Sequence, residues 1–245
     1  MHSSPSDEID TREFVFPLIT IVIKNDLAQK RTMKFLGTAF FVAKNGVAVT
    51  AAHVIPREIE SDRILAAALF VDGKENIYPI EDVLRLDEFD FALLSVQCPP
   101  TKYLPIAMPR LLMGTDVEIL GIPDHTTTDD GTKQMRLLKG HIVTLDSKKF
   151  EVNFPVPAGM SGSPVLVDDH VVGYATGRVR SEELEDLYEE IEEISNNVEK
   201  ITIIKSHRVT LYGVGHPFQQ IMNLTLTALE DQTLAQFLAI QNERP

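Results

Sequence analysis

The sequence predicts an all-β protein in which two antiparallel, six-stranded β-barrels pack together. The first observation is a series of six short runs, rich in β-branched and aromatic residues, over residues 13–97. The second is the proline-rich stretch 98–114, which favours an extended connector over a regular element. The third is a further series of such runs over residues 115–216. Two equal series of strands joined by a connector are typical of two closed sheets.

Six strands are expected in the first barrel. The pair Asn45-Gly46 is the strongest hairpin indicator, because both residues tolerate the positive φ angles of a tight type I′ turn. The expected strands cover residues 14–23, 34–43, 46–54, 64–73, 76–86 and 89–96.

The second barrel is expected to contain an acidic helical insertion. Its strands are predicted over residues 116–123, 135–145, 149–154, 163–167, 170–179 and 201–215. Between the last two, residues 181–199 carry apolar side chains at nearly helical spacing, and Ser181 is a suitable N-cap, which together predict an amphipathic helix. Residues 217–245 predict C-terminal helices, and the polar segment 1–12 is expected to be disordered.

Charge and composition exclude several classes of partner. The formal net charge is −13, from 23 basic and 36 acidic residues, and such a surface repels nucleic acid and anionic membranes. No apolar run approaches the roughly 18 residues of a membrane span. Cys98 is the single cysteine, so no intramolecular disulfide forms, and the first residues lack the features of a signal peptide. A cytoplasmic protein without nucleic-acid or membrane partners is therefore expected.

Residues 157–167, PAGMSGSPVLV, place Gly159, Ser161 and Gly162 immediately before a predicted strand. By itself this pattern is typical of a tight turn. It also suits a nucleophilic serine, because glycines allow a sharply turned backbone on which the Ser161 hydroxyl stands free. The N–H groups of Gly159 and Ser161 would then receive the oxyanion that forms during acyl transfer, and a Cβ at residue 159 would obstruct that approach.

A nucleophilic serine requires an imidazole base and a carboxylate that orients the imidazole. His53 closes a predicted strand among small residues in VTAAHV, and Asp90 precedes the apolar strand of DFALL. Asp87 is the nearby rival carboxylate, but no apolar strand follows it directly. Five other histidines lie in no comparable motif and are expected to be structural or surface residues: His125, His141, His170, His207 and His216.

The segments GTAFFVAKNGVAVTAAHV, DFALL and GMSGSPV, in this order, resemble the three active-site blocks of the chymotrypsin/trypsin-like serine proteases. The resemblance covers about residues 14–220 and is greatest to short, disulfide-free members such as the HtrA-type protease domain. It implies a trypsin-like fold and a serine endopeptidase with Ser161 as nucleophile, His53 as general base and Asp90 as orienting carboxylate. Gly159 and Ser161 would form the oxyanion hole. It also implies a protein or peptide substrate, with no metal and no cofactor.

The resemblance implies a substrate-binding surface as well. Pro155, six residues before Ser161, matches the base of the primary pocket, and its lack of charge argues against a Lys or Arg preference. The pocket wall is expected from Tyr174 to Arg178, where backbone groups pair with an extended substrate. Arg178 either attracts an acidic side chain or is solvated. The residues expected to contact substrate are Pro155, Ala158, Tyr174, Thr176, Gly177 and Arg178.

Two positions depart from the family pattern. Met160 stands where many secreted relatives carry the aspartate that pairs with a freshly cleaved N-terminus, so activity without N-terminal processing is expected. Ser163 replaces a glycine, a change small enough to be tolerated. Two alternatives stay open, namely a catalytically silent trypsin-fold module that binds peptides or regulates, and an esterase. Because an active cytoplasmic protease needs restraint, a regulatory protein partner is expected.

Overall fold

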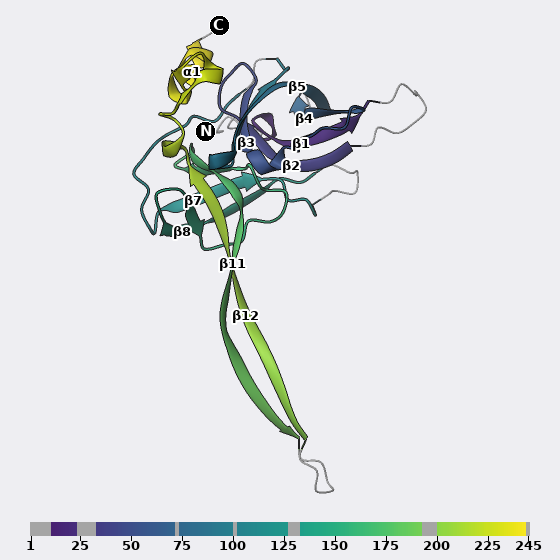
Figure 1. Ribbon diagram of the computed structural model, residues 1–245, viewed down its shortest axis with the longest axis vertical. Coiled ribbons are helices and arrows are strands. Elements are labelled where there is room, and N and C mark those ends of the chain that lie inside the picture. The colour runs from purple at the N-terminus through teal and green to yellow at the C-terminus, as the bar shows by residue number, and fades with distance from the viewer. Residues whose placement is uncertain are drawn as a thin grey trace, which may run out of the picture.

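In the computed structural model, two closed β-barrels pack together and the chain ends in a short α-helix (Figure 1). The fold class predicted from the sequence is therefore confirmed. The structure describes residues 11–23, 33–71, 74–99, 102–126, 133–192 and 200–243, and at residue 12 and over 180–192 and 200–210 it describes the backbone alone.

The first barrel closes in the strand order β1-β2-β3-β6-β5-β4. Its interior is filled by side chains that alternate with outward-facing positions, and the rings of Phe16 and Phe41 lie 4.7 Å apart within it. Gly46, in the predicted Asn45-Gly46 turn, has a φ of 72°. The strands are β1 (Val15–Val22), β2 (Met33–Phe41), β3 (Val47–Ala51), β4 (Arg63–Val71), β5 (Lys74–Leu86) and β6 (Phe91–Val96).

The second barrel closes in the order β10-β11-β12-β9-β8-β7. Ile119, Ile142 and Phe150 are fully buried at its centre. Its strands are β7 (Asp116–Gly121), β8 (Arg136–Leu145), β9 (Phe150–Val152), β10 (Pro164–Val167), β11 (His170–Glu192) and β12 (Lys200–Pro217).

A third apolar cluster holds the two barrels together. It combines Phe40 and Phe91 of the first barrel with Tyr174 of the second and with Leu234 of the helix α1 (Leu234–Glu243). The connector between the barrels donates backbone hydrogen bonds to each of them. Leu104 N donates to Phe41 O of the first barrel (3.0 Å), and Ala107 N donates to Val171 O of the second (2.9 Å). The relative position of the barrels is thus fixed by packing and by hydrogen bonds.

The predicted acidic helix 181–199 is wrong over its described part. Strand β11 runs on to Glu192 and pairs with β12 up to the pair Glu192–Lys200, which forms a two-stranded ribbon beyond the barrel (Figure 1). Residues 193–199 lie outside the described residues. The apolar residues have helical spacing, but the backbone N–H and C=O groups that a helix would pair internally are paired here with the antiparallel strand β12.

The two termini also differ from expectation. Within 217–245, the only described α-helix is α1, and before it lie the 3-10 turns η4 (Phe218–Gln220) and η5 (Thr227–Leu229) and a small hairpin of β13 (Thr225–Leu226) and β14 (Gln232–Thr233). Of the segment 1–12, residues 1–10 lie outside the described residues. Residues 11 and 12 belong to the 3-10 turn η1 (Thr11–Glu13).

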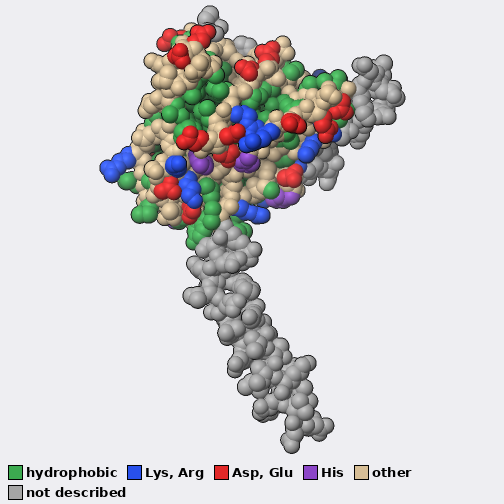
Figure 2. All heavy atoms as spheres, in the orientation of Figure 1, with side chains coloured by type: hydrophobic (Ala, Val, Ile, Leu, Met, Phe, Trp, Pro, Cys, Tyr) green, Lys and Arg blue, Asp and Glu red, His purple; other side chains and the backbone are tan. Residues whose placement is uncertain are grey.

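The described surface mixes charges of both signs. Acidic and basic side chains are interspersed over the face shown in Figure 2. No helix among the described residues is long and apolar enough to cross a membrane.

Removing the outer ribbon should leave the barrels folded. Strand β11 pairs with β10 only over residues 170–174, and β12 pairs with β9 only over residues 213–215, so the ribbon beyond Arg180 and Leu211 adds no described pairing to either barrel. Joining Arg180 to Leu211 through an Asn-Gly turn should change the melting temperature by less than about 4 °C, which corresponds to roughly 1 kcal/mol in a chain of this size. A chain that no longer unfolds cooperatively in a calorimeter would contradict this expectation.

Candidate active site

His53 and Asp90 are brought together by the pairing of β3 with β6. Because Ala51 faces Phe91 across this antiparallel pair, the residue just after β3 and the residue just before β6 are neighbours. His53 lies in the 3-10 turn η2 (Ala52–Val54), and its Nδ1 lies 2.7 Å from Asp90 Oδ2. The backbone N–H of His53 donates to the other carboxylate oxygen of Asp90 at 2.9 Å. The carboxylate therefore fixes both the imidazole and the turn that carries it.

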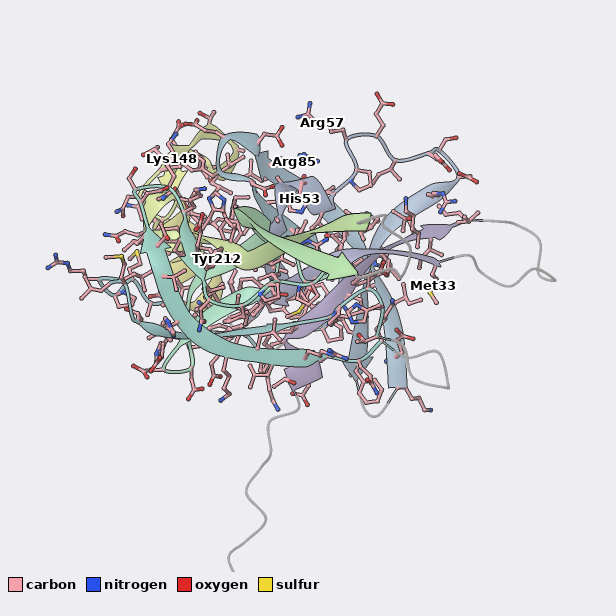
Figure 3. The ribbon with its side chains drawn as sticks, turned by 90° about the horizontal axis from the view of Figure 1, so that it is seen from below. Met33, His53, Arg57, Arg85, Lys148 and Tyr212 are labelled. Atoms are coloured by element: carbon pink, nitrogen blue, oxygen red, sulfur yellow. The ribbon has the colours of Figure 1, made fainter. Side chains whose placement is uncertain are left out.

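Asp87, the rival carboxylate, has a different partner. It begins the 3-10 turn η3 (Asp87–Phe89), and its carboxylate accepts from Arg85 Nη2 at 2.8 Å and lies 3.5 Å from Arg57 Nη2. The hydrogen bond from Arg85 lowers the pKa of Asp87. Arg85 also donates to Ile55 O at 2.7 Å, so one guanidinium ties the turn before Asp90 to the turn after His53. Figure 3 shows His53, Arg57 and Arg85 on the same side of the molecule.

The Ser161 loop belongs to the second barrel and lies against β2 of the first. Thr38, which is fully buried, donates its backbone N–H to Ser161 O (3.0 Å) and its hydroxyl to Gly159 O (2.9 Å). Gly162 has a φ of +85°, and a Cβ there would lie 2.2 Å from Thr38 O. Gly37 makes the same approach from β2, since its Cβ would lie 2.8 Å from Val54 and 3.1 Å from Ser161 O. Glycine at both positions lets the nucleophile loop reach the His53 turn.

The same loop leaves two backbone N–H groups free. Ala158 O accepts a hydrogen bond from Asp124 N at 2.8 Å, and because a trans peptide points its C=O and N–H in opposite directions, the Gly159 N–H is directed away from Asp124. Among the described residues, neither this N–H nor that of Ser161 has a hydrogen-bond acceptor. Gly159 has a φ of +91°, and a Cβ there would lie 2.4 Å from Asp124 N. Glycine is thus needed at residue 159 for packing behind the loop, rather than to clear the oxyanion side as the sequence suggested.

The Ser161 hydroxyl donates to Thr176 O at 3.2 Å and is not hydrogen-bonded to His53 in this structure. Thr176 is the extra residue of a β-bulge in β11, between Ala175 and Gly177, so its carbonyl lies outside the regular ladder. The structure therefore places Ser161 next to β11 and places His53 with Asp90.

The residues expected to bind substrate occupy different environments. Pro155, Ala158 and Arg178 are exposed, and Thr176 and Gly177 are half-buried. Tyr174 is only 1% exposed and packs in the core between the barrels, so its predicted place in a pocket wall is wrong. In a regular strand Tyr174 would share a face with Thr176 and Arg178, and the bulge at Thr176 breaks that alternation.

Ser163, at the end of the Ser161 loop, is a buried serine that differs from Ser161. Ser163 is fully buried, and among the described residues its hydroxyl has no hydrogen-bond partner. It fits because Gly121 faces it, where any Cβ would lie 1.9 Å from Ser163 Oγ. The sequence did not identify Thr38 as a functional residue. The only indication in the sequence is a threonine that follows Gly37 in a mostly apolar strand.

A reactive thiol or a metal centre would be another source of chemistry among the described residues. Burial raises the pKa of Cys98 to about 11, so its reactive thiolate is scarce at neutral pH. Among the described residues, no group of three or more His, Cys, Asp and Glu side chains is placed to hold a metal ion.

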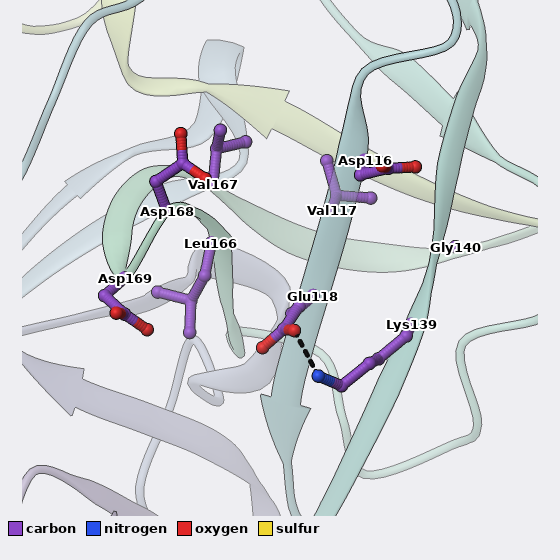
Figure 4. Close-up of a pocket in the computed structure, with 9 residues that line it drawn as sticks. All are labelled: Asp116, Val117, Glu118, Lys139, Gly140, Leu166, Val167, Asp168 and Asp169. Atoms are coloured by element: carbon purple, nitrogen blue, oxygen red, sulfur yellow. Dashed lines mark hydrogen bonds and ion pairs between the residues drawn. The ribbon is translucent and has the colours of Figure 1, made fainter.

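A separate groove lies on the second barrel, between β7, β8 and the turn after β10 (Figure 4). It has a volume of about 580 Å³ and contains none of the three candidate catalytic residues. Glu118 and Lys139 form an ion pair across it, and Asp116, Asp168 and Asp169 complete its charged lining. The candidate active site is therefore distinct from this groove.

The two barrels, with a His–Asp pair on one and a turned serine loop on the other, define the class of double-barrel serine hydrolase folds. Within that class, a sequence model of the trypsin-like peptidase domain matches residues 37–173, more than half of the 245 residues. The chain belongs to the family of trypsin-like peptidase domains. No curated protein sequence matches it.

Solved structures share the fold at low sequence identity. The HtrA-type protease AlgW, solved with a decapeptide, is 17% identical with a TM-score of 0.53, and the match covers 85% of this chain and 62% of AlgW. Deg5 is 18% identical with a TM-score of 0.52, and the match covers 71% of this chain and 88% of Deg5. The MamO protease domain from Magnetospirillum magneticum, in its apo form, is 13% identical with a TM-score of 0.53, and the match covers 86% and 95%. At such identities these likenesses show the fold alone.

Replacing Gly159 by alanine should impair the candidate oxyanion hole. The new Cβ would collide with Asp124 N and shift the peptide that carries the free N–H. Loss of one oxyanion donor costs about 10²–10³-fold in rate, so labelling of Ser161 by an acylating or phosphonylating probe should slow to that extent. Gly114→Ala is the matched control, because Gly114 has a similar φ of +84° with nothing within 4 Å of its Cβ. Equal slowing in both variants would contradict the assignment.

Replacing Arg85 by methionine should loosen the turns that carry His53 and Asp90. The Arg85 side chain is 22% exposed, and its loss leaves the Ile55 carbonyl without that donor. A hydrogen bond from a charged group contributes about 1.5–3 kcal/mol, so the free energy of unfolding in urea should fall by that amount. Arg57→Met should change it by less than about 0.5 kcal/mol, since the Arg57 side chain is 81% exposed. Equal stability of the two variants would contradict the stabilising role of Arg85.

Proposed function

We propose that the chain is a serine endopeptidase. The observation that carries this proposal is the pair of free N–H groups, at Gly159 and Ser161, on a loop packed against the barrel that carries the His53–Asp90 pair. A serine hydroxyl, an oriented imidazole and two unpaired amides are the groups that acyl transfer requires. Membership of the trypsin-like peptidase family supports the same reaction.

The proposed reaction proceeds through an acyl-enzyme. The Ser161 hydroxyl attacks the scissile carbonyl while His53 accepts its proton, and the amides of Gly159 and Ser161 stabilise the negative charge on the carbonyl oxygen. The Asp90 carboxylate, bonded to His53 Nδ1, holds the imidazole so that Nε2 faces the serine, and it stabilises the imidazolium. His53 then protonates the leaving amine, and water releases the acyl group by the reverse sequence of proton transfers.

The proposed substrate is an extended peptide. Thr176 and Gly177 on β11 offer backbone groups beside Ser161, and a peptide pairing there would present its carbonyl to the nucleophile. Pro155 and Ala158 are exposed near the loop and carry no charge, which favours an uncharged side chain at the cleavage position. A regulatory partner and a cytoplasmic location stay predictions.

A second candidate is a catalytically silent peptide-binding module of the same fold. It is favoured by one observation, the hydrogen bond that Ser161 donates to Thr176 O in place of His53. An esterase acting on small acyl groups would use the same residues as the endopeptidase, so only substrate profiling separates those two.

A fluorophosphonate probe at neutral pH separates catalysis from silent binding. The wild-type chain should be labelled, Ser161→Ala should not be, and His53→Ala should be labelled more slowly by about 10⁴-fold or more. Ser163→Ala is the matched control for the serine, since its hydroxyl is buried and without a described partner. His170→Ala is the control for the histidine, because His170 is exposed at the first position of β11. A folded wild-type chain that resists the probe would favour the silent module.

A further inference from the structure

Tyr174 links the second barrel to the turn that carries Asp90. Its hydroxyl donates to Phe89 O at 2.6 Å, and Phe89 immediately precedes Asp90 in the chain. Tyr174 lies on β11 of the second barrel, whereas Phe89 belongs to η3 of the first. This hydrogen bond therefore spans the junction between the two barrels.

The Asp90 turn is the strained part of the site. Asp90 has φ 50° and ψ 39°, in the left-handed region that residues with a Cβ rarely adopt. Within the first barrel, Asp90 N donates to Asp87 O at 3.2 Å and Ala52 N donates to Asp90 O at 2.9 Å. The Tyr174 hydroxyl adds a donor from the other barrel to the peptide between Phe89 and Asp90, whose rotation would swing the carboxylate.

The Tyr174 ring is held firmly enough to fix that peptide. It stacks on His216 of the neighbouring strand with a centroid distance of 5.7 Å and an interplanar angle of 15°, and it packs against Phe91 and Phe218 at 5.7 Å each. Burial, reinforced by the nearby Asp90 charge, raises the pKa of Tyr174, so the hydroxyl keeps its proton and remains a donor. Burial lowers the pKa of His216, which favours the neutral ring in the stack.

We propose that Tyr174 is a positioning residue that sets the Asp90 carboxylate, and through it His53, relative to Ser161. Strand β11 contacts both ends of the site, since Tyr174 holds the peptide before Asp90 and Thr176 O accepts from the Ser161 hydroxyl. The two contacts are two residues apart on one strand. The inference rests on the proposed catalytic function, but its geometric part concerns only the Asp90–His53 hydrogen bond.

The test compares Tyr174→Phe with the wild-type chain. The substitution removes the hydroxyl and keeps the ring and its apolar contacts. By proton NMR, the low-field resonance of the His53 Nδ1–H that is bonded to Asp90 should move upfield or broaden, and fluorophosphonate labelling of Ser161 should slow about tenfold or more. Tyr78→Phe is the matched control, because Tyr78 is half-buried on β5 and packs against the core of the first barrel. The control should keep the wild-type resonance and labelling rate.

The two readouts separate failure of this inference from failure of the proposed function. If the wild-type chain shows the resonance but resists the probe, the catalytic proposal fails, and the resonance in Tyr174→Phe still decides the positioning role. An unchanged resonance in Tyr174→Phe overturns the inference, even if the variant melts at a lower temperature, because a purely structural hydroxyl would affect stability alone. Since the resonance position does not depend on how much of the sample is folded, partial destabilisation leaves the comparison intact.

Discussion

The candidate site depends on the hydrogen bonds of one buried threonine between the barrels. The N–H of Thr38 donates to Ser161 O, and its hydroxyl donates to Gly159 O. The same hydroxyl accepts a hydrogen bond from Ile122 N (3.0 Å), and the Thr38 carbonyl accepts one from Thr50 Oγ1 (2.7 Å). The bonds to Gly159, Ser161 and Ile122 join β2 to the second half of the chain, whereas the bond from Thr50 ties β2 to β3 of the same barrel. With His53 and Asp90 on one barrel and Ser161 on the other, their alignment requires such a fixed joint. Buried polar groups that are fully paired are costly to disturb, which makes the joint stiff.

The sequence predicted the barrels well because their strands are defined by local patterns. Short apolar runs bounded by turn residues mark all twelve barrel strands, although β11 and β12 continue well beyond the expected ends. The sequence also favoured Asp90 over Asp87, and the two carboxylates have different surroundings in the structure. Asp90 directly precedes a buried strand that pairs with the strand before His53, whereas Asp87 faces Arg85 and Arg57.

The failures of sequence reasoning share one cause, which is that long-range pairing is invisible in a local pattern. Residues 181–192 show helical spacing, but the partner strand β12 lies beyond them in the chain and pairs with them in register. Tyr174 was assigned to a pocket wall by the family resemblance, and its burial between the barrels depends on packing against Phe91 and Phe218, which a local pattern does not show. Thr38 was overlooked because its partners, Gly159 and Ser161, lie more than a hundred residues away.

The hydrogen bond from Ser161 to Thr176 O bears on whether the site is silent. Turning the hydroxyl toward His53 exchanges one hydrogen bond for another, and such bonds contribute about 0.5–1.5 kcal/mol each. A difference of this size changes the population of a hydroxyl orientation by roughly tenfold at most. Enzymes typically lower the activation free energy by about 8 kcal/mol or more, so the orientation of the hydroxyl is a small effect by comparison. A peptide N–H that bonded to Thr176 O would also release the hydroxyl. The resting direction of Ser161 is therefore a weak argument for inactivity. The free amides of Gly159 and Ser161 are a stronger argument for catalysis, because together with the His53–Asp90 pair they supply the groups that acyl transfer requires.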